Sequence, residues 1–418
     1  MRVTVFALIV VFMCGLAAVG ADLDGQKVVM KTGDSLRRNV VLKTECGADV
    51  PENARIVATG EKTGKDYPVT LRDGELVIVT EGGLPDTEYT YTLRVEEMTA
   101  ASPAPRVVIK KQDDKDIVDV FIDDEHFTSY HYSEDWKKPF LWPVNGEDGH
   151  GLTRAWPMDE DADTPEYAQD HVHHKSLYTA YGEVQLEDGD VADLWGEGGG
   201  SGWQHVNEVT WGSGDAYGWI VSKNTWQNGD REPLIDETRE YRFYSTPADA
   251  RFIDVAVTFD ARYGKVTFKD TKEGGLVALR MSPEISYRNG KITNARGDEG
   301  EQEAWGRPAA WCDYSADVED IGWRGIAVFD HPENLRHPTC WHVRKYGLMG
   351  ANSFGYSYFS DNEAEEGSMP ENGDYVFEED GSLTFNYRVY VHSGSTRRAN
   401  VKARFADYAA PPVVTTAE

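Results

Sequence analysis

The sequence has few cysteines, and they lie far apart along the chain. Only four occur in 418 residues, at Cys14, Cys46, Cys312 and Cys340. This spacing excludes a zinc knuckle and a dense disulfide framework, because both need closely grouped cysteines. In an oxidising compartment Cys312 and Cys340 have two alternatives, one disulfide or two buried thiols, and the sequence leaves both open.

Long apolar runs are also missing after the first 21 residues. No later stretch reaches the roughly 20 apolar residues that a membrane helix needs, so we expect no membrane span. At the start of the chain, Met1 and Arg2 precede an apolar run from Val3 to Ala18, and small residues lead to Ala21. This pattern is typical of a signal peptide. We therefore expect residues 1–21 to be removed and the protein to be secreted or periplasmic, with release into the medium left open.

Positive charge is scarce. The chain has 42 Lys and Arg against 72 Asp and Glu, which gives a formal net charge of -30 at pH 7. Such an acidic protein repels polyanions, which argues against nucleic acid and anionic membrane surfaces as partners.

Helical periodicity is absent over any three turns, whereas strand-like runs are frequent. Clear examples are residues 117–122, 252–259 and 383–391, which are rich in β-branched and aromatic residues. The 12 Trp and 21 Tyr suit a large sandwich with ring-lined faces. The sequence therefore predicts an all-β protein whose main part is a large antiparallel β-sandwich.

The chain divides near residue 104. Residues 22–104 alternate short apolar runs with turn formers such as Asp73-Gly74, which is typical of a small β-sandwich. A linker rich in Pro and Ala follows at residues 101–105. We predict a small N-terminal domain over 22–104 and a large domain over 105–412.

The densest polar run is residues 170–183, where His171, His173 and His174 fall within four positions. Imidazole is neutral enough near pH 7 to bind a metal or to exchange protons. In an extended strand, His173 and Lys175 would share one face and His174 would lie on the other, so the three rings could not all face one pocket. Backbone hydrogen bonding at a strand entrance is the alternative role.

Two further segments bring polar groups into apolar surroundings. His205 follows a glycine-rich loop whose backbone can approach a ligand closely. Lys272, Glu273 and Arg280 enter an otherwise apolar strand, and buried charges are costly unless paired. These three residues form either an ionic brace or a substrate clamp, and Trp305 could add a stacking ring.

The last segment is residues 340–347. In an extended run, the side chains of His342, Arg344 and Tyr346 share a face, which places an acid/base candidate, an anion binder and a phenol together. A polar face turned towards water is the alternative.

Together these motifs resemble the PmoA-like family, labelled methane oxygenase, over roughly residues 115–395. The resemblance rests on the run His173-His174-Lys175-Ser176-Leu177-Tyr178, Gly182-Glu183-Val184, Asp193-Leu194-Trp195, residues 270–275, Glu303-Ala304-Trp305-Gly306, Asp330-His331-Pro332, and residues 337–347. The departures are Lys175 where Arg is usual, Leu194 where Phe is usual, and Cys340 where an aromatic residue is common. Lys for Arg weakens any bidentate contact with an anion.

The resemblance implies a secreted β-sandwich protein of the kind found beside carbohydrate-degrading systems, with a supersandwich like that of galactose mutarotase as one form of the fold. Our leading hypothesis is an extracytoplasmic enzyme that acts on a carbohydrate, or another small polar substrate, by hydrolysis or β-elimination. The catalytic candidates are His173, His174, His342 and Tyr346. The substrate-binding candidates are Lys175, His205, Lys272, Glu273, Arg280, Trp305 and Arg344.

Two alternatives stay open. The family label implies a metal-dependent oxygenase, in which His171, His173 and His205 would hold a divalent metal as cofactor. The third hypothesis is a non-catalytic glycan-binding envelope protein whose N-terminal domain is an interaction module.

Overall fold

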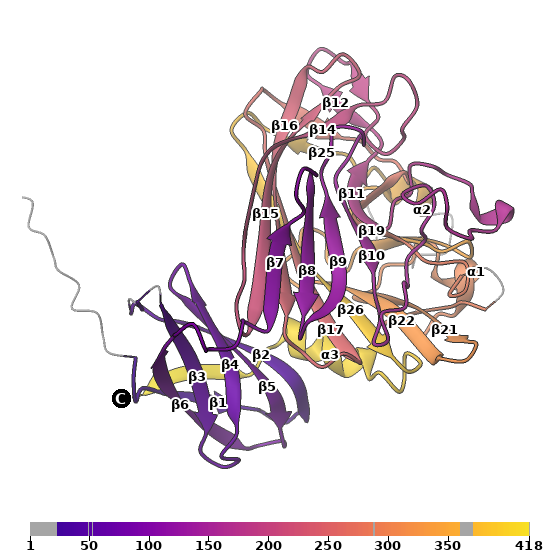
Figure 1. Cartoon of the computed structure of the whole chain (residues 1–418). Helices are drawn as coiled ribbons and strands as arrows, with labels where there is room; N and C mark the ends of the chain where they lie inside the picture. The colour runs from indigo at the N-terminus through magenta and orange to yellow at the C-terminus, as the bar shows by residue number, and fades with distance from the viewer. Residues whose placement is uncertain (1–22, 49, 52, 287–288, 360–370, 418) are drawn as a thin grey trace, which may run out of the picture.

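The structure is a computed structural model that describes residues 23–48, 50–51, 53–286, 289–359 and 371–417. The predicted signal peptide lies outside these residues. The described chain is built mainly from large antiparallel sheets in a sandwich-like arrangement (Figure 1). The all-β class and the antiparallel sandwich predicted from sequence are therefore confirmed.

One eight-stranded sheet carries the histidine-rich segments. Its strand order is β23-β24-β19-β11-β10-β9-β8-β7, so strands from the last third of the chain lie beside strands from the middle. The strands are β7 (Val107–Lys111), β8 (Ile117–Ile122), β9 (Glu125–His131), β10 (Phe140–Val144), β11 (Leu177–Tyr181), β19 (Gly274–Arg280), β23 (Cys340–Arg344) and β24 (Leu348–Asn352).

A second eight-stranded sheet packs against the first, with the order β14-β15-β16-β17-β26-β22-β21-β20. Its strands are β14 (Trp203–Gly212), β15 (Tyr217–Gln227), β16 (Pro233–Tyr244), β17 (Ala250–Asp260), β20 (Lys291–Asn294), β21 (Trp311–Val318), β22 (Gly322–Asp330) and β26 (Ser382–Ser393).

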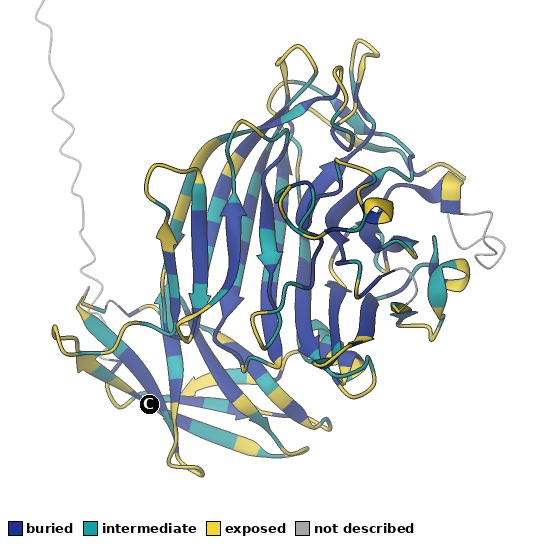
Figure 2. Ribbon diagram, turned by 45° about the vertical axis from the view of Figure 1, so that its right-hand side comes forward, coloured by how far each residue is buried: buried dark blue, intermediate teal, exposed yellow. Residues whose placement is uncertain are grey.

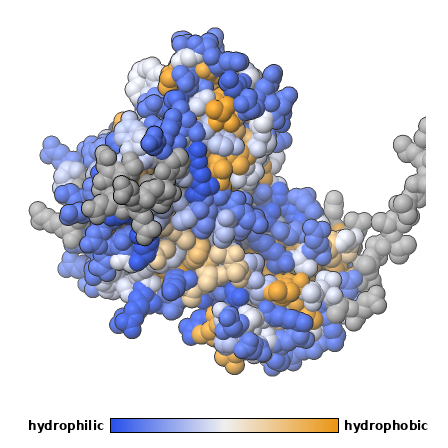
Figure 3. Space-filling model, turned by 180° about the vertical axis from the view of Figure 1, so that it is seen from behind, coloured by the Kyte–Doolittle hydropathy of each residue, from blue (hydrophilic) through white to orange (hydrophobic). Residues whose placement is uncertain are grey.

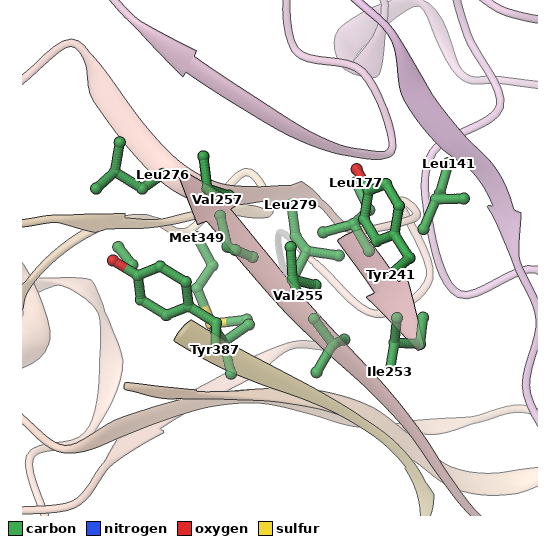
Figure 4. Close-up of a cluster of buried hydrophobic side chains, with 14 of the residues drawn as sticks. Leu141, Leu177, Tyr241, Ile253, Val255, Val257, Leu276, Leu279, Met349 and Tyr387 are labelled. Atoms are coloured by element: carbon green, nitrogen blue, oxygen red, sulfur yellow. The ribbon is translucent and has the colours of Figure 1, made fainter. Parts of the chain in front are cut away.

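The core between these sheets follows from strand alternation. Val255 and Val257 on β17 point inward because side chains two apart share a face, and they meet Leu177 and Leu279 of the first sheet (Figure 4). Buried residues follow the middle of both sheets, whereas exposed residues concentrate in the loops (Figure 2). A packed core of this kind makes the sheet edges a rigid support for loops.

Smaller elements complete the large part of the molecule. A four-stranded sheet has the order β13-β12-β18-β25, with β12 (Val184–Leu186), β13 (Val191–Ala192), β18 (Val266–Phe268) and β25 (Tyr375–Phe377). The described helices are short: η1 (Glu166–Ala168), α1 (Gly300–Ala304), α2 (Tyr356–Phe359) and α3 (Val401–Ala409).

The N-terminal strands form a separate seven-stranded sheet that also includes the end of the chain. Its order is β2-β5-β4-β3-β6-β1-β27. The strands are β1 (Lys27–Lys31), β2 (Arg37–Glu45), β3 (Ala54–Gly60), β4 (Asp66–Arg72), β5 (Glu75–Gly83), β6 (Glu88–Glu97) and β27 (Val413–Ala417). The predicted large domain ends at residue 412, so both predicted domains leave out β27, which pairs with β1 of the N-terminal sheet.

The N-terminal sheet packs directly on the sandwich. Val77 and Val79 of β5 share a buried cluster with Tyr217 and Tyr244 of the second sheet. Ion pairs frame this contact, including Arg55 to Asp215 at 2.8 Å and Arg72 to Glu240 at 2.7 Å.

The cysteines Cys312 and Cys340 are both buried free thiols, so the structure favours the thiol alternative over the disulfide. None of the helices in the described part of the chain has the length and apolar character that a membrane crossing requires. The surface seen from behind is largely hydrophilic, with apolar residues gathered in a few patches (Figure 3).

Candidate functional site

A cavity of about 830 Å³ lies over the first sheet. At one end of the strands it is lined by residues that precede β11 and follow β23, and at the other end by residues that follow β11 and precede β19. It collects side chains from six separate stretches of sequence. The lining residues are His171, His173, His174, Gly182, Glu183, Asp193, Trp195, Gly196, Lys272, Glu273, Glu301, His342, Arg344, Lys345 and Tyr346.

The histidine run forms a turn and not a strand. β11 begins only at Leu177, and His171 has a left-handed φ of 45°. The ring of His174 lies 4.8 Å from that of His171 and 4.3 Å from that of His173, measured between centroids. The extended strand on which the separation of the three rings was predicted is therefore absent here, and all three rings line one cavity because a turn has no alternation of faces.

Arg154 holds this turn in place. The guanidinium is buried, and its Nη1 donates to the carbonyls of Ala168 at 2.8 Å and Asp170 at 2.7 Å. Its Nη2 donates to the carbonyls of His171 at 3.0 Å and His174 at 2.8 Å. One planar, five-donor group thus satisfies four backbone acceptors that a strand would have paired.

Asp170 and His171 form a carboxylate–imidazole dyad. The Nδ1 of His171 lies 2.8 Å from one Asp170 oxygen, and the other oxygen accepts from Arg154 at 3.1 Å and from Arg280 at closer range. Burial acts to raise the pKa of Asp170, but the charge of Arg280 and the contact with His171 lower it below its ordinary value. An ionised carboxylate on Nδ1 fixes the ring and leaves Nε2 as the atom that exchanges a proton.

Arg280 braces the site from behind. Its side chain is fully buried and does not line the cavity. Its Nη1 lies 3.3 Å from Nδ1 of His174, and since a guanidinium can only donate, Nδ1 accepts and neutral His174 carries its proton on Nε2. Burial, then the neighbouring His173 and Arg280, lowers the pKa of His174 well below its ordinary value. Of the two roles predicted for Arg280, the geometry assigns the ionic brace and removes the substrate clamp.

His173 and His342 are neutral imidazoles at pH 7. Burial, helped by the charge of Lys138, lowers the pKa of His173 to about 3, and burial with Arg344 does the same for His342. Trp195 contacts both rings, at 6.1 Å and 6.2 Å between centroids. The Nδ1 of His342 is buried and has no hydrogen-bond partner among the described residues. Both rings can hydrogen-bond a substrate hydroxyl, but both are weak bases.

Tyr346 places a phenol beside the dyad. Its ring stacks on that of His171 at 5.0 Å and 16°, and the guanidinium of Arg280 lies 4.4 Å from its centroid. Burial raises the pKa of Tyr346 to about 12, so the hydroxyl keeps its proton at neutral pH. The phenol is therefore a proton donor next to a proton acceptor.

Cationic side chains line another part of the cavity. Arg344 binds Glu301 at 3.1 Å and lies 5.0 Å from the ring of Trp305, which stands beneath Arg344 and does not line the cavity. Lys272 forms a close ion pair with Glu273. Both cations are partly exposed, so an anionic ligand can compete for them.

Lys175 is not available to a ligand. It is fully buried beneath the histidine turn, where its Nζ donates to the carbonyl of Val172 at 2.9 Å and binds Glu197 at 2.9 Å. A second buried lysine, Lys138, lies on the other side of Glu197 at 3.4 Å. Lys175 therefore supports the turn, and its predicted role in substrate binding is corrected.

His205 lies on β14 outside the cavity, where its Nδ1 binds Glu134 at 2.7 Å. The predicted metal ligands His171, His173 and His205 are consequently not brought together. Over residues 23–417, apart from the undescribed positions, no group of three or more His, Cys, Asp or Glu is arranged to hold a metal ion.

The structure thus brings most of the predicted site residues to one cavity. His171, His173, His174, His342, Tyr346, Lys272, Glu273 and Arg344 line it, whereas Lys175, His205, Arg280 and Trp305 do not. Sequence reasoning gave no role to Arg154 or Glu301, which carry no local motif. It also overlooked the role of Asp170, although its place next to His171 was a usable signal.

Comparison with known proteins gives a family but no activity. No curated protein matches the chain. The profile of a family of unknown function, DUF6807, matches residues 117–406, which include every segment of the cavity. The resemblance to PmoA-like proteins stays a prediction. Since the match covers well over half of the 418 residues, the chain belongs to the DUF6807 family.

Proposed function

We propose that this protein is an extracytoplasmic enzyme that cleaves an acidic carbohydrate by β-elimination in the histidine-lined cavity. One observation carries the proposal: the Asp170–His171 dyad stacks directly on protonated Tyr346 in a cavity that also presents cations. The signal-like residues 1–21 support an extracytoplasmic location.

His171 is the proposed base. Among the cavity histidines it is the one with a carboxylate on Nδ1, which stabilises the imidazolium that forms when Nε2 takes a proton. His173 and His342 suit another task, because their low pKa values make them poor proton acceptors and good neutral partners for sugar hydroxyls.

Arg344 and Lys272 are the proposed contacts for the substrate carboxylate. Removing the proton next to a carboxylate builds negative charge on that group, and nearby cations stabilise this charge. Both cations already face the cavity with a carboxylate partner, Glu301 or Glu273, that a bound uronate would replace or share.

The reaction balances with these groups alone. Nε2 of His171 removes the proton at C5 of a uronic acid residue, and the C–H electron pair forms the C4=C5 double bond. The C4–O bond breaks, and Tyr346 donates its hydroxyl proton to the departing oxygen. The imidazolium then returns the proton taken from C5 to the phenolate, through water or directly, which restores both groups for the next turnover.

Hydrolysis by a carboxylate pair has less support. Such a mechanism needs two carboxyl groups free to act on one bond. Of the cavity carboxylates, Asp193 accepts backbone N–H groups from Trp195 and Gly196 at 2.9 Å each, while Glu273 and Glu301 hold cations. Glu183 alone has no ion-pair or hydrogen-bond partner for its carboxylate in the described chain.

The test is a panel of uronate-containing and neutral polysaccharides incubated with the purified protein. Elimination produces an unsaturated sugar that absorbs ultraviolet light, whereas hydrolysis produces new reducing ends without this absorbance. We expect unsaturated product from a uronate polymer, and a rate lower by about 10²–10⁴-fold in His171→Ala and Tyr346→Phe.

His205→Ala is the matched control, because this partly exposed histidine has a carboxylate partner but lies outside the cavity. It should keep the full rate. Reducing ends without unsaturation, binding without any product, or full activity in His171→Ala would each overturn the proposal.

A further inference from the structure

A second cavity of about 700 Å³ lies on another face of the sandwich, at the end of the second sheet formed by β20, β21 and β22. Its walls come from the loop after β20, the segment 395–398 and the first turn of α3. It shares no lining residue with the histidine-lined cavity.

The charge of this cavity is opposite to that of the protein. Five cationic side chains line it, Lys291, Arg296, Arg397, Arg398 and Lys402, against one carboxylate, that of Glu299. The whole chain has 42 basic and 72 acidic residues. A local excess of cations on so acidic a protein is expected where an anion binds.

Several of these cations have no partner of their own. In the described chain, the side chains of Arg397, Arg398 and Lys402 make no ion pair or hydrogen bond, and all three residues are exposed. By contrast, Arg296 lies 3.6 Å from Asp298, and Lys291 lies over the ring of Trp323 at 5.4 Å. Three cations on adjoining turns repel one another, and a bound anion relieves that repulsion.

The walls are fixed by hydrogen bonds before any ligand binds. Thr396 donates to Asp313 at 2.5 Å, and the backbone N–H of Ala399 donates to the carbonyl of Ser395 at 2.8 Å. Asn294 accepts the backbone N–H groups of Arg296 and Asp298 at 2.9 and 3.2 Å. A cavity that keeps its shape without ligand loses little entropy when the ligand binds.

Two tryptophans give the cavity an apolar wall beside its cations. Trp311 on β21 is buried and Trp323 on β22 is half-buried, and both line the cavity beside the cations. Indole rings stack on the flat faces of sugars, while arginines hold carboxylate or sulfate groups. The volume falls within the range of pockets that enclose small ligands.

We infer that this cavity binds a short acidic oligosaccharide through its carboxylate or sulfate groups. The ligand is short. A long polyanion would extend beyond the basic patch and be repelled by the acidic surface around it. For a short ligand, salt screens the acidic groups that lie more than about 10 Å away. The inference goes beyond the proposed elimination and does not depend on it.

The experiment is calorimetric titration of the full chain with three tetrasaccharides: a uronate, a sulfated neutral sugar and an uncharged sugar. The two anionic probes distinguish carboxylate from sulfate recognition. We expect one or both to bind and the uncharged sugar to bind weakly or not at all. The triple variant Arg397→Gln, Arg398→Gln, Lys402→Gln should weaken anion binding by at least about tenfold, and Trp323→Ala should weaken it independently of charge.

Two controls make the result specific. The triple variant Arg38→Gln, Lys110→Gln, Lys115→Gln removes the same charge from exposed positions outside both cavities and should leave the affinity unchanged. All titrations use the His171→Ala background, which does not turn the uronate over, and adding Arg344→Gln and Lys272→Gln removes the proposed carboxylate contacts of the histidine-lined cavity and should leave the affinity of the second cavity unchanged. Equal affinity in the cavity triple variant, equal loss in the control triple, or tighter binding of an RNA tetranucleotide than of either acidic sugar would overturn the inference.

Discussion

The imidazoles of the histidine-lined cavity have different neighbours. His171 binds a carboxylate, His174 accepts from a guanidinium, and His342 is buried with one nitrogen unpartnered in the described chain. The rings with a lowered pKa, His174 and His342, can therefore serve as neutral hydrogen-bonding groups at pH 7, and our proposal gives the role of base to His171.

Burial of neutral histidine makes stability depend on pH. In the folded protein the pKa of His342 is about 3, against an ordinary value of 6.5. Between these values the unfolded chain binds a proton that the folded chain does not, so the free energy of unfolding falls as the pH falls from 6.5 towards 3. In His342→Gln this part of the slope disappears, and the curve should be flatter by up to about 1.4 kcal/mol per pH unit.

Denaturant unfolding at a series of pH values measures this slope. His150→Gln is the control, since His150 is partly exposed and bound to Glu284 at 2.7 Å outside the cavity. This variant removes an imidazole at another place, so a slope lost equally in both variants would not be specific to His342. If the free energy of unfolding changed with pH in the same way in the wild type and in His342→Gln, the lowered pKa of His342 would be contradicted.

The strands of the sandwich could be predicted from sequence, whereas the functional turn could not. Alternation in β17 and β26 is a local property, so Phe252–Phe259 and Leu383–Val391 are recognisable as strands without any knowledge of their partners. The turn at 171–174 depends on Arg154, which is distant in sequence and has no motif. A prediction that lacks this contact takes the histidine run as the beginning of β11 and places the three rings on opposite faces of a strand.

Arg154→Met tests the turn as an element. The variant leaves four carbonyls without their donor and Asp170 without one of its two arginines, so we expect a loss of stability of about 3–5 kcal/mol and loss of activity. Arg154→Lys keeps the charge but not the planar fork, and it should recover only part of both. Denaturant unfolding and hydrogen exchange of residues 168–174 measure the effect.

Arg324→Met is the comparison, because Arg324 is similarly buried and pairs with Asp148 but does not line the cavity. It should lower stability without a specific loss of activity or faster exchange at 168–174. If the backbone amides of residues 168–174 exchanged no faster in Arg154→Met than in Arg324→Met, contacts other than those of Arg154 would determine the shape of the turn.

Across the whole molecule, the chain returns at its end to the sheet where the described residues begin. β27 pairs with β1 over five residues, and Arg37 binds Asp407 and the carbonyl of Ala410 just before that strand. Five residues of the sequence VVTTA suit any sheet edge, so sequence alone could not assign them to the N-terminal sheet. The pairing couples the N-terminal sheet to α3, and hence to the second sheet of the sandwich.

Removing residues 411–418 should loosen the N-terminal sheet and leave the sandwich intact. The truncation keeps the Arg37 contacts but exposes the edge of β1, whose Val28 and Met30 are otherwise buried. We expect faster hydrogen exchange in β1 and β6 with unchanged protection in β17 and β26, because the cores of the two parts are separate clusters. Val414→Asp should reproduce much of the effect, whereas Val413→Ala should not, since Val414 packs on the N-terminal core and Val413 is 62% exposed. Unchanged exchange in β1 after truncation would mean that β27 adds no stability to the sheet it completes.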